Sequence, residues 1–146
     1  MNTNTKILVA SLATAVASFL LGWLISGMLL DPYFKANTTA EGLAIWKQME
    51  NMNMIGMFIS SLAGAVLVSW SLSRMGVTTA MAGLFPGAMI GCLMTISFDM
   101  FIYSMMNMYA TKMIVIVDVL ASTIIYAILG GIAGWVLGMG RKTAAA

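Results

Sequence analysis

Four long runs of apolar residues dominate this sequence of 146 residues. A helix needs about 20 mostly apolar residues to cross a hydrocarbon core of roughly 30 Å. Two of the runs contain no charged residue, and the other two are each interrupted by a single aspartate; the runs cover 7–30, 54–73, 77–106 and 113–139. They are too long for strands and show no alternation of apolar and polar residues. The pattern predicts an all-α, polytopic membrane protein with a single transmembrane domain over residues 1–146.

The residue inventory excludes several classes of protein. Hydrophobic residues make up 61% of the chain and charged residues 8%, whereas a soluble domain carries about 25% charged residues. This rules out a soluble enzyme, a disordered chain and a nucleic-acid-binding protein. Histidine is absent from the sequence and Cys92 is the single cysteine, so the usual haem and zinc ligands are missing and no disulfide framework can form. We therefore expect no enzymatic activity, no cofactor and no nucleic-acid partner.

The connections between the runs predict the topology. The segment 31–53 is the only long connection, and short connections make neighbouring helices antiparallel. We therefore expect an antiparallel four-helix bundle with one longer loop between the first two helices. Within that loop, Thr38 and Glu41 fit a capping box with Thr38 as the N-cap. The helix that follows, which includes Trp46, is either a short interfacial helix or the start of the second spanning helix.

The first run also has features of a signal peptide. Lys6 precedes the apolar stretch, and 15–17 reads Ala-Val-Ala, like a cleavage site. However, the apolar run continues to Leu30, which is longer than the apolar region of a signal peptide, so we interpret it as a retained membrane helix.

The basic residues indicate an orientation. An even number of spans puts both termini on one side of the membrane. Positive residues favour the cytoplasm, and the side with the termini carries four of them against three on the other side, which places both termini in the cytoplasm. This small margin also leaves insertion in both orientations open. The two groups are Lys6, Arg74, Arg141 and Lys142, and Lys35, Lys47 and Lys112.

Small and polar residues recur at every fourth position of the last two runs. Such residues let membrane helices pack closely. If the hairpin turns near Met108 and Tyr109, residues whose numbers add to 217 lie at equal depth, so that Asp99 matches Asp118. We expect tight contact between glycines, as in a glycine zipper, and two neighbouring aspartates in the half that faces the loop. The two rows are Gly83, Gly87, Gly91, Thr95, Asp99, Tyr103 and Asn107, and Asp118, Ser122, Tyr126, Gly130, Gly134 and Gly138.

The two aspartates have two interpretations. A charged aspartate at the centre of a spanning helix costs about 2.5 to 3.5 kcal/mol, and two like charges at one depth repel each other. Protonation of at least one carboxyl, or a bound cation, would relieve this cost. Asp99 and Asp118 are thus either a proton or cation site or a hydrogen-bonded staple that fixes the hairpin. The polar residues expected around such a site are Tyr103, Asn107, Thr95, Ser122 and Tyr126.

Methionines suggest a rival site. The chain has 16 of them, and thioethers are soft ligands that suit Cu(I). The other interpretation is that methionine fills irregular gaps or adapts to partner helices. The candidate cluster at the loop end of the helices is Met49, Met52, Met54, Met57, Met105, Met106 and Met108.

Several short motifs resemble those of a known group of proteins. They are the stretch 21–24 (Leu-Gly-Trp-Leu) followed by Asp31, Phe98-Asp99 with Tyr103 and 107–108, and 117–118 with the glycine-rich 130–138. In these features the chain is similar to small four-helix proteins of the bacterial inner membrane that form a domain family of unknown function. The resemblance covers nearly the whole chain. It implies a four-span protein of the inner membrane and supplies no activity.

These features favour a non-enzymatic integral membrane protein. We expect an accessory subunit of a membrane complex or a homo-oligomeric packing module, with the lipid bilayer and other membrane subunits or copies of itself as partners. The alternative is a small oligomeric channel or transporter for protons or a cation that uses Asp99 and Asp118. A soft-metal-binding protein comes third.

Overall fold

The computed structural model describes residues 2–47 and 51–140, and this part of the chain is mostly helical and contains no strand. Four of its helices are long and apolar enough to cross a membrane, as the sequence predicts. The first spanning segment consists of α1 and a π-helical turn, η1, and two short helices, α2 and α3, precede the other three spanning helices. The elements are α1 (Thr3–Leu24), η1 (Ile25–Leu29), α2 (Asp31–Asn37), α3 (Ala40–Ile45), α4 (Met54–Arg74), α5 (Ala80–Met105) and α6 (Met113–Gly138).

Side-chain caps fix the start of α1 and α5. Asn2 accepts a hydrogen bond from the Thr5 backbone N–H at 2.8 Å, so α1 begins at Thr3 rather than at residue 7. Thr79 caps α5 in the same way, and this explains why that helix starts at Ala80 rather than at residue 77. Such a cap satisfies one of the backbone N–H groups that a helix leaves without a partner in its first turn.

The connection over 31–53 contains more helix than the sequence predicts. Pro32 stands in the first turn of α2, where its missing N–H is not needed. The prediction of Thr38 as the N-cap of the next helix is wrong by one residue. The Thr38 hydroxyl donates to the Phe34 carbonyl oxygen at the end of α2, while Thr39 accepts from the Gly42 N–H and caps α3. Both threonines suit a helix end, and the sequence alone does not say which end each one serves.

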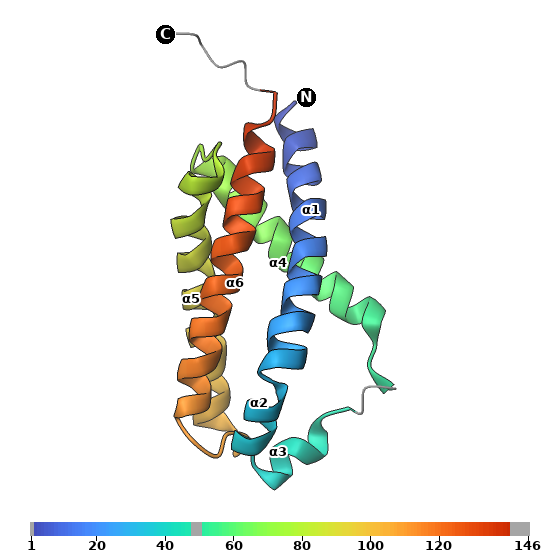
Figure 1. Ribbon diagram of the computed structural model, residues 1–146, viewed down its shortest axis with the longest axis vertical. Helices are drawn as coiled ribbons and strands as arrows, with labels where there is room; N and C mark the ends of the chain where they lie inside the picture. Colours follow the sequence, from blue (N-terminus) through green and yellow to red (C-terminus); the bar gives the residue numbers. More distant parts are fainter. Residues whose placement is uncertain (1, 48–50, 141–146) are drawn as a thin grey trace.

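The long helices do not all run in one direction. Figure 1 shows α1, α5 and α6 along the long axis of the molecule, while α4 crosses them obliquely. The first turn of α1 and the last turn of α6 lie at one end, which we call the termini end. The helices α2 and α3 and the turn between α5 and α6 lie at the opposite end, the loop end. The most extensive packing in the fold joins α5 to α6.

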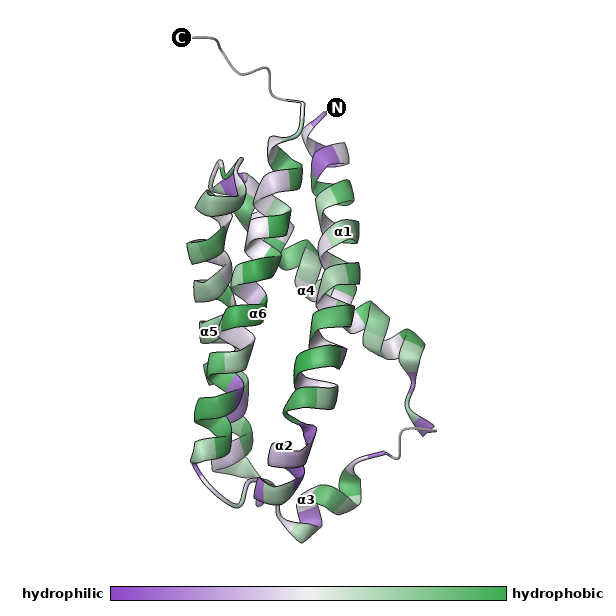
Figure 2. Ribbon diagram, viewed as in Figure 1, coloured by the Kyte–Doolittle hydropathy of each residue, from purple (hydrophilic) through white to green (hydrophobic). Residues whose placement is uncertain are grey.

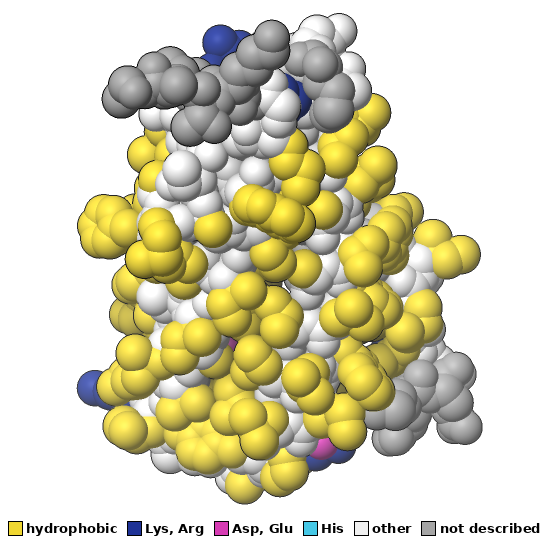
Figure 3. Space-filling model, turned by 45° about the horizontal axis from the view of Figure 1, so that its top comes forward, with side chains coloured by type: hydrophobic (Ala, Val, Ile, Leu, Met, Phe, Trp, Pro, Cys, Tyr) yellow, Lys and Arg dark blue, Asp and Glu magenta, His cyan; other side chains and the backbone are white. Residues whose placement is uncertain are grey.

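Large apolar side chains point outward from all four long helices. Figure 2 shows hydrophobic residues along their length, and Figure 3 shows apolar side chains around the flank of the molecule. Met81 and Ile55 are 77% and 76% exposed, an arrangement that suits contact with lipid rather than with water. The tightly buried core is small and lies towards the termini end; it comprises Ala10, Val68, Leu72, Val77, Ala133, Val136 and Leu137.

Candidate functional site

Glycines bring the backbones of α5 and α6 into direct contact. A Cβ atom added at Gly87 would lie 2.8 Å from the Gly130 Cα, well inside the usual carbon–carbon contact distance of about 3.5 to 4.0 Å. A Cβ atom at Gly91 would lie 2.6 Å from the ring of Tyr126 and 3.0 Å from the Ser122 carbonyl oxygen. As the residue numbers rise along α5, those of the partners on α6 fall, so these two helices form an antiparallel hairpin.

The hairpin register agrees with the expected depth pairing in part. Gly87 meets Gly130, and the numbers of these two residues add to 217 as expected. Gly83 meets Gly130 and Gly131 rather than Gly134, and Gly134 instead lies against the Thr79 backbone. A row of every fourth residue rotates by about 40° per step on a helix of 3.6 residues per turn, so one row cannot keep the same partners along its whole length. Gly138, at the end of the row, lies against Thr78.

The hairpin brings Asp99 and Asp118 together. Asp99 is 2% exposed, and its carboxyl group lies within interaction range of the half-buried Asp118 carboxyl. The Oδ2 atom of Asp99 is buried and has no hydrogen-bond partner in the described part of the chain. Asp99 is six residues before the end of α5 and Asp118 five residues after the start of α6, so both lie about 8 to 9 Å inside the helix ends. The pair therefore lies in the half of the hairpin that faces the loop end.

A tyrosine in the turn between α5 and α6 forms a hydrogen bond to the acid pair. The Tyr109 hydroxyl donates a hydrogen bond to Asp99 Oδ1 at 3.1 Å. Burial, together with the negative charge of the nearby Asp99 carboxyl, raises the pKa of the Tyr109 hydroxyl well above its usual range. The hydroxyl therefore remains a hydrogen-bond donor at neutral pH. The sequence places Tyr109 at the turn but gives no sign that its side chain returns to Asp99.

The chain between α2 and α3 holds this turn in place. The Asn37 carbonyl accepts from the Ala110 N–H at 2.8 Å, and the Thr39 N–H donates to the Met108 carbonyl at 2.9 Å. The Thr39 hydroxyl also donates to the Asn107 carbonyl at 2.7 Å. Between these bonds, Thr38 and Tyr109 form an isolated antiparallel bridge. This set of bonds, which we call the loop clasp, fixes the backbone on both sides of the tyrosine.

Replacing Tyr109 by Phe should destabilise the protein in a pH-dependent way. The lost hydrogen bond is worth about 1.5 kcal/mol, so the variant should unfold more readily than the wild type at neutral pH. Tyrosine in an unfolded chain loses its proton at about pH 10, whereas folded Tyr109 keeps its proton. The extra stability of the wild type over the variant is therefore complete below that pH and decreases above it. Unfolding midpoints in detergent across this range measure the difference.

Tyr33→Phe is the matched control for this measurement. The Tyr33 ring packs edge-on against Phe34 in α2, and the hydrogen bond to Asp99 comes from Tyr109 instead. This variant should show no loss of stability comparable with that of Tyr109→Phe. Equal effects of the two variants would contradict a specific role for the Tyr109 hydroxyl.

The other expected polar residues do not join the carboxyls directly. Within the described residues, neither carboxyl has a hydrogen bond with Tyr103, Asn107, Thr95 or Ser122. Tyr103, Thr95 and Ser122 are half-buried on the hairpin, whereas Asn107 is exposed and contributes its backbone carbonyl to the loop clasp.

Tyr126 contacts two helices. Its ring packs against Gly91 of α5, and its hydroxyl oxygen would lie 3.2 Å from a Cβ atom added at Gly64 of α4. The residue therefore links the hairpin to the oblique helix. It lies one helical turn beyond Ser122 and two turns beyond Asp118 on the same row of α6.

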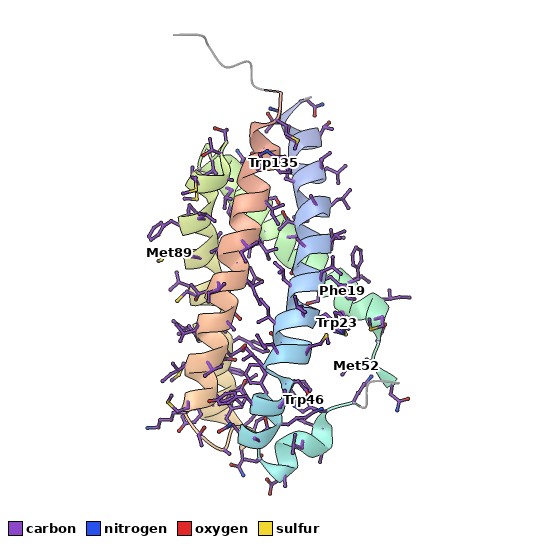
Figure 4. All side chains as sticks on the ribbon, viewed as in Figure 1. Phe19, Trp23, Trp46, Met52, Met89 and Trp135 are labelled. Atoms are coloured by element: carbon purple, nitrogen blue, oxygen red, sulfur yellow. The ribbon has the colours of Figure 1, made fainter. Side chains whose placement is uncertain are left out.

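The methionines do not converge on one site. Met52 and Met57 line a hollow of about 460 Å³ together with Trp46 at the loop end; Figure 4 labels Met52 and Trp46. Met105 and Met106 are exposed and are not among the residues that line this hollow, and Met49 lies outside the described residues. The two remaining members are also separate, because Met54 is exposed and Met108 lies beside Gly42 of α3. Among the described residues there is also no group of three His, Cys, Asp or Glu side chains that could hold a metal ion.

Comparison of the chain with known protein families, curated proteins and solved structures finds no match. The resemblance to small inner-membrane proteins of bacteria therefore stays a prediction.

Proposed function

We propose that this chain is a non-enzymatic integral membrane protein that moves protons, with Asp99 and Asp118 as the proton-binding pair. The observation that carries the proposal is the surroundings of Asp99. Its carboxyl group is almost completely buried, one oxygen accepts from Tyr109, and the other faces no donor in the described part of the chain. Ionisable residues inside a membrane are costly and are usually functional.

The neighbourhood favours a proton over a metal cation as the bound species. Two adjacent carboxylates without a cation repel each other, and a single shared proton turns this repulsion into a hydrogen bond. A metal ion would need further ligands, and the described residues contain no group of three His, Cys, Asp or Glu side chains that could hold one. The proton would enter from the loop end, past the Tyr109 hydroxyl.

Continuation of the path requires more than one copy of the chain. Beyond the acid pair, Ser122 and Tyr126 follow on α6, but the glycine contact between α5 and α6 then leaves no room between these two helices. We infer that the proton passes along a surface completed by a second copy. The chain would thus act as a homo-oligomer, in an antiparallel bundle with a glycine zipper between α5 and α6.

Proton flux into proteoliposomes tests the proposal. Vesicles that contain the wild-type chain should acidify when a potassium diffusion potential drives protons inward, as reported by an enclosed pH-sensitive dye. The double variant Asp99→Asn/Asp118→Asn keeps the size and polarity of both side chains but cannot titrate, so its flux should fall to the leak of protein-free vesicles. Asp31→Asn is the matched control, because it removes an aspartate that lies outside the spans, and it should conduct like the wild type. Equal flux in the double variant and the wild type would contradict the proposal.

The second candidate is an accessory subunit or a homo-oligomeric packing module, in which the acid pair is only a staple. The outward face of α5 favours it, because Phe85 is 73% exposed and Phe98 66% exposed on a helix that packs mainly against α6. Absence of proton flux in the wild type would favour this function. Gentle extraction from the native membrane would then identify the subunits that copurify.

We further propose that both termini face the cytoplasm and that the protein lies in the inner membrane of a bacterium. The excess of basic residues at the termini end supports the orientation. The resemblance noted from the sequence supports the choice of membrane. Under this proposal, the acid pair and the loop clasp lie on the outer side.

A further inference from the structure

Charge is distributed unequally between the two ends of the molecule. The sequence has no Asp or Glu in 1–30, 51–98 or 119–146. The termini end, where α1 starts and α4 and α6 end, is built from these stretches. The acidic residues of α5 and α6, Asp99 and Asp118, lie towards the loop end, so no described acidic residue lies at this end beside Lys6 and Arg74. Figure 3 shows basic side chains at this end of the molecule.

A polar hollow opens at the same end. It has a volume of about 250 Å³ and lies between the first turns of α1, the end of α4, the link from α4 to α5 and the end of α6. Its lining residues include Thr3, Lys6, Ser73 and Thr78. The lining thus contains one lysine and three residues that carry a hydroxyl group.

Lys6 is held at the rim of this hollow and keeps hydrogen-bonding capacity. Its ammonium group donates to the Leu137 carbonyl oxygen at 3.4 Å, a long bond to the last turns of α6. An ammonium group has three N–H donors, and the Lys6 side chain has no second hydrogen bond within residues 2–47 and 51–140. The other donors are therefore open to an anion in the hollow.

The depth of the hollow matches that of lipid headgroups. Thr3 is the first residue of its spanning segment and Arg74 the last of its own. Arg74 lies over the ring of the exposed Trp70, with its guanidinium carbon 5.5 Å from the ring centre. Trp135, labelled in Figure 4, is exposed near the same end of α6. Tryptophan and basic side chains gather at the membrane–water interface, where the phosphates of lipids lie.

We propose that this hollow binds the phosphate group of an anionic phospholipid. The Lys6 ammonium group would pair with the phosphate oxygens, and the hydroxyls of Thr3 and Ser73 would donate hydrogen bonds to them. Basic pockets between spanning helices bind anionic headgroups by this chemistry. The site is independent of the proposed proton pair at the other end of the hairpin.

Thermal unfolding of the full chain in detergent with added phosphatidylglycerol tests the site. The midpoint should rise with phosphatidylglycerol and not with phosphatidylcholine. Lys6→Gln should weaken the apparent affinity for phosphatidylglycerol about fivefold, since one basic residue near the membrane surface is worth about that factor. Lys112→Gln removes the same charge at the loop end and should leave the affinity unchanged. Ser73→Ala keeps the charge and should weaken binding less than Lys6→Gln, which provides a second test if Lys6→Gln does not fold.

Four outcomes would overturn the proposal. Equal stabilisation by the two lipids would show that the hollow does not select an anionic headgroup. Equal losses in Lys6→Gln and Lys112→Gln would show general attraction to charge rather than a site. An affinity that is unchanged in both Ser73→Ala and Lys6→Gln would show that the lipid does not bind in this hollow. A test with inorganic phosphate in place of lipid distinguishes free phosphate from a lipid headgroup. If inorganic phosphate stabilised the protein as strongly as phosphatidylglycerol does, the assignment to a lipid would be overturned.

Discussion

The variant Gly130→Ala should destabilise the protein by about 3 kcal/mol, the upper part of the range for an overpacked interior. The added Cβ would lie 2.8 Å from the Gly87 Cα and 3.1 Å from the Gly87 nitrogen, and would also meet the Gly83 carbonyl oxygen. All three are backbone atoms within α5, so they cannot move aside as a flexible side chain could. The two helices would have to separate, and the contacts between Tyr126 and Gly91 would be lost with them. The midpoint of thermal unfolding in detergent measures the effect.

Gly22→Ala is the matched control because it adds the same methyl group to another spanning helix. No atom lies within 4 Å of a Cβ atom at Gly22. The substitution should therefore be neutral or slightly stabilising, since alanine favours a helix over glycine by up to about 1 kcal/mol. Similar unfolding midpoints for the two alanine variants would show that α5 and α6 are not packed backbone to backbone.

The coarse fold could be predicted because it depends on local pattern. Run length alone defines four spanning helices, and the ends of α4 and α6 lie within one residue of the predicted limits. The small residues of the hairpin could be predicted for a similar reason. Residues that repeat every four positions lie on one side of a helix, so two such rows joined by a short turn face each other.

The details that depend on distant contacts could not be predicted. The loop clasp joins Asn37 and Thr39 to residues about 70 positions later in the chain, and no spacing rule connects them. The direction of the Tyr109 side chain depends on the backbone of a turn that the clasp itself fixes. The oblique path of α4 likewise depends on its packing against α1 and α6, which lie far from it in the sequence. The sequence therefore identified the acid pair but not the tyrosine that binds it.

The acid pair should hold one proton at neutral pH. Replacing both aspartates should therefore completely abolish the infrared band of a protonated carboxyl group. Two buried carboxylates side by side would combine like-charge repulsion with the loss of hydration. One proton placed between them removes one charge and supplies the hydrogen-bond donor that Asp99 Oδ2 lacks in the described structure. The Tyr109 hydroxyl then stabilises the remaining charge through Asp99 Oδ1. Asp31 lies outside the spanning segments and forms an ion pair with Lys35 at 2.8 Å, so it has no part in this shared proton.

Infrared spectroscopy of the reconstituted protein with carbon-13-labelled aspartate tests this sharing of a proton most directly. The chain has three aspartates, so the labelled carbonyl band of a protonated carboxyl reports on few groups. We expect this band at neutral pH in the wild type and in Asp31→Asn, and we expect it to be absent from Asp99→Asn/Asp118→Asn. A wild-type spectrum without the band at neutral pH, or a band that survives in the double variant, would show that the two carboxyls do not hold a proton between them.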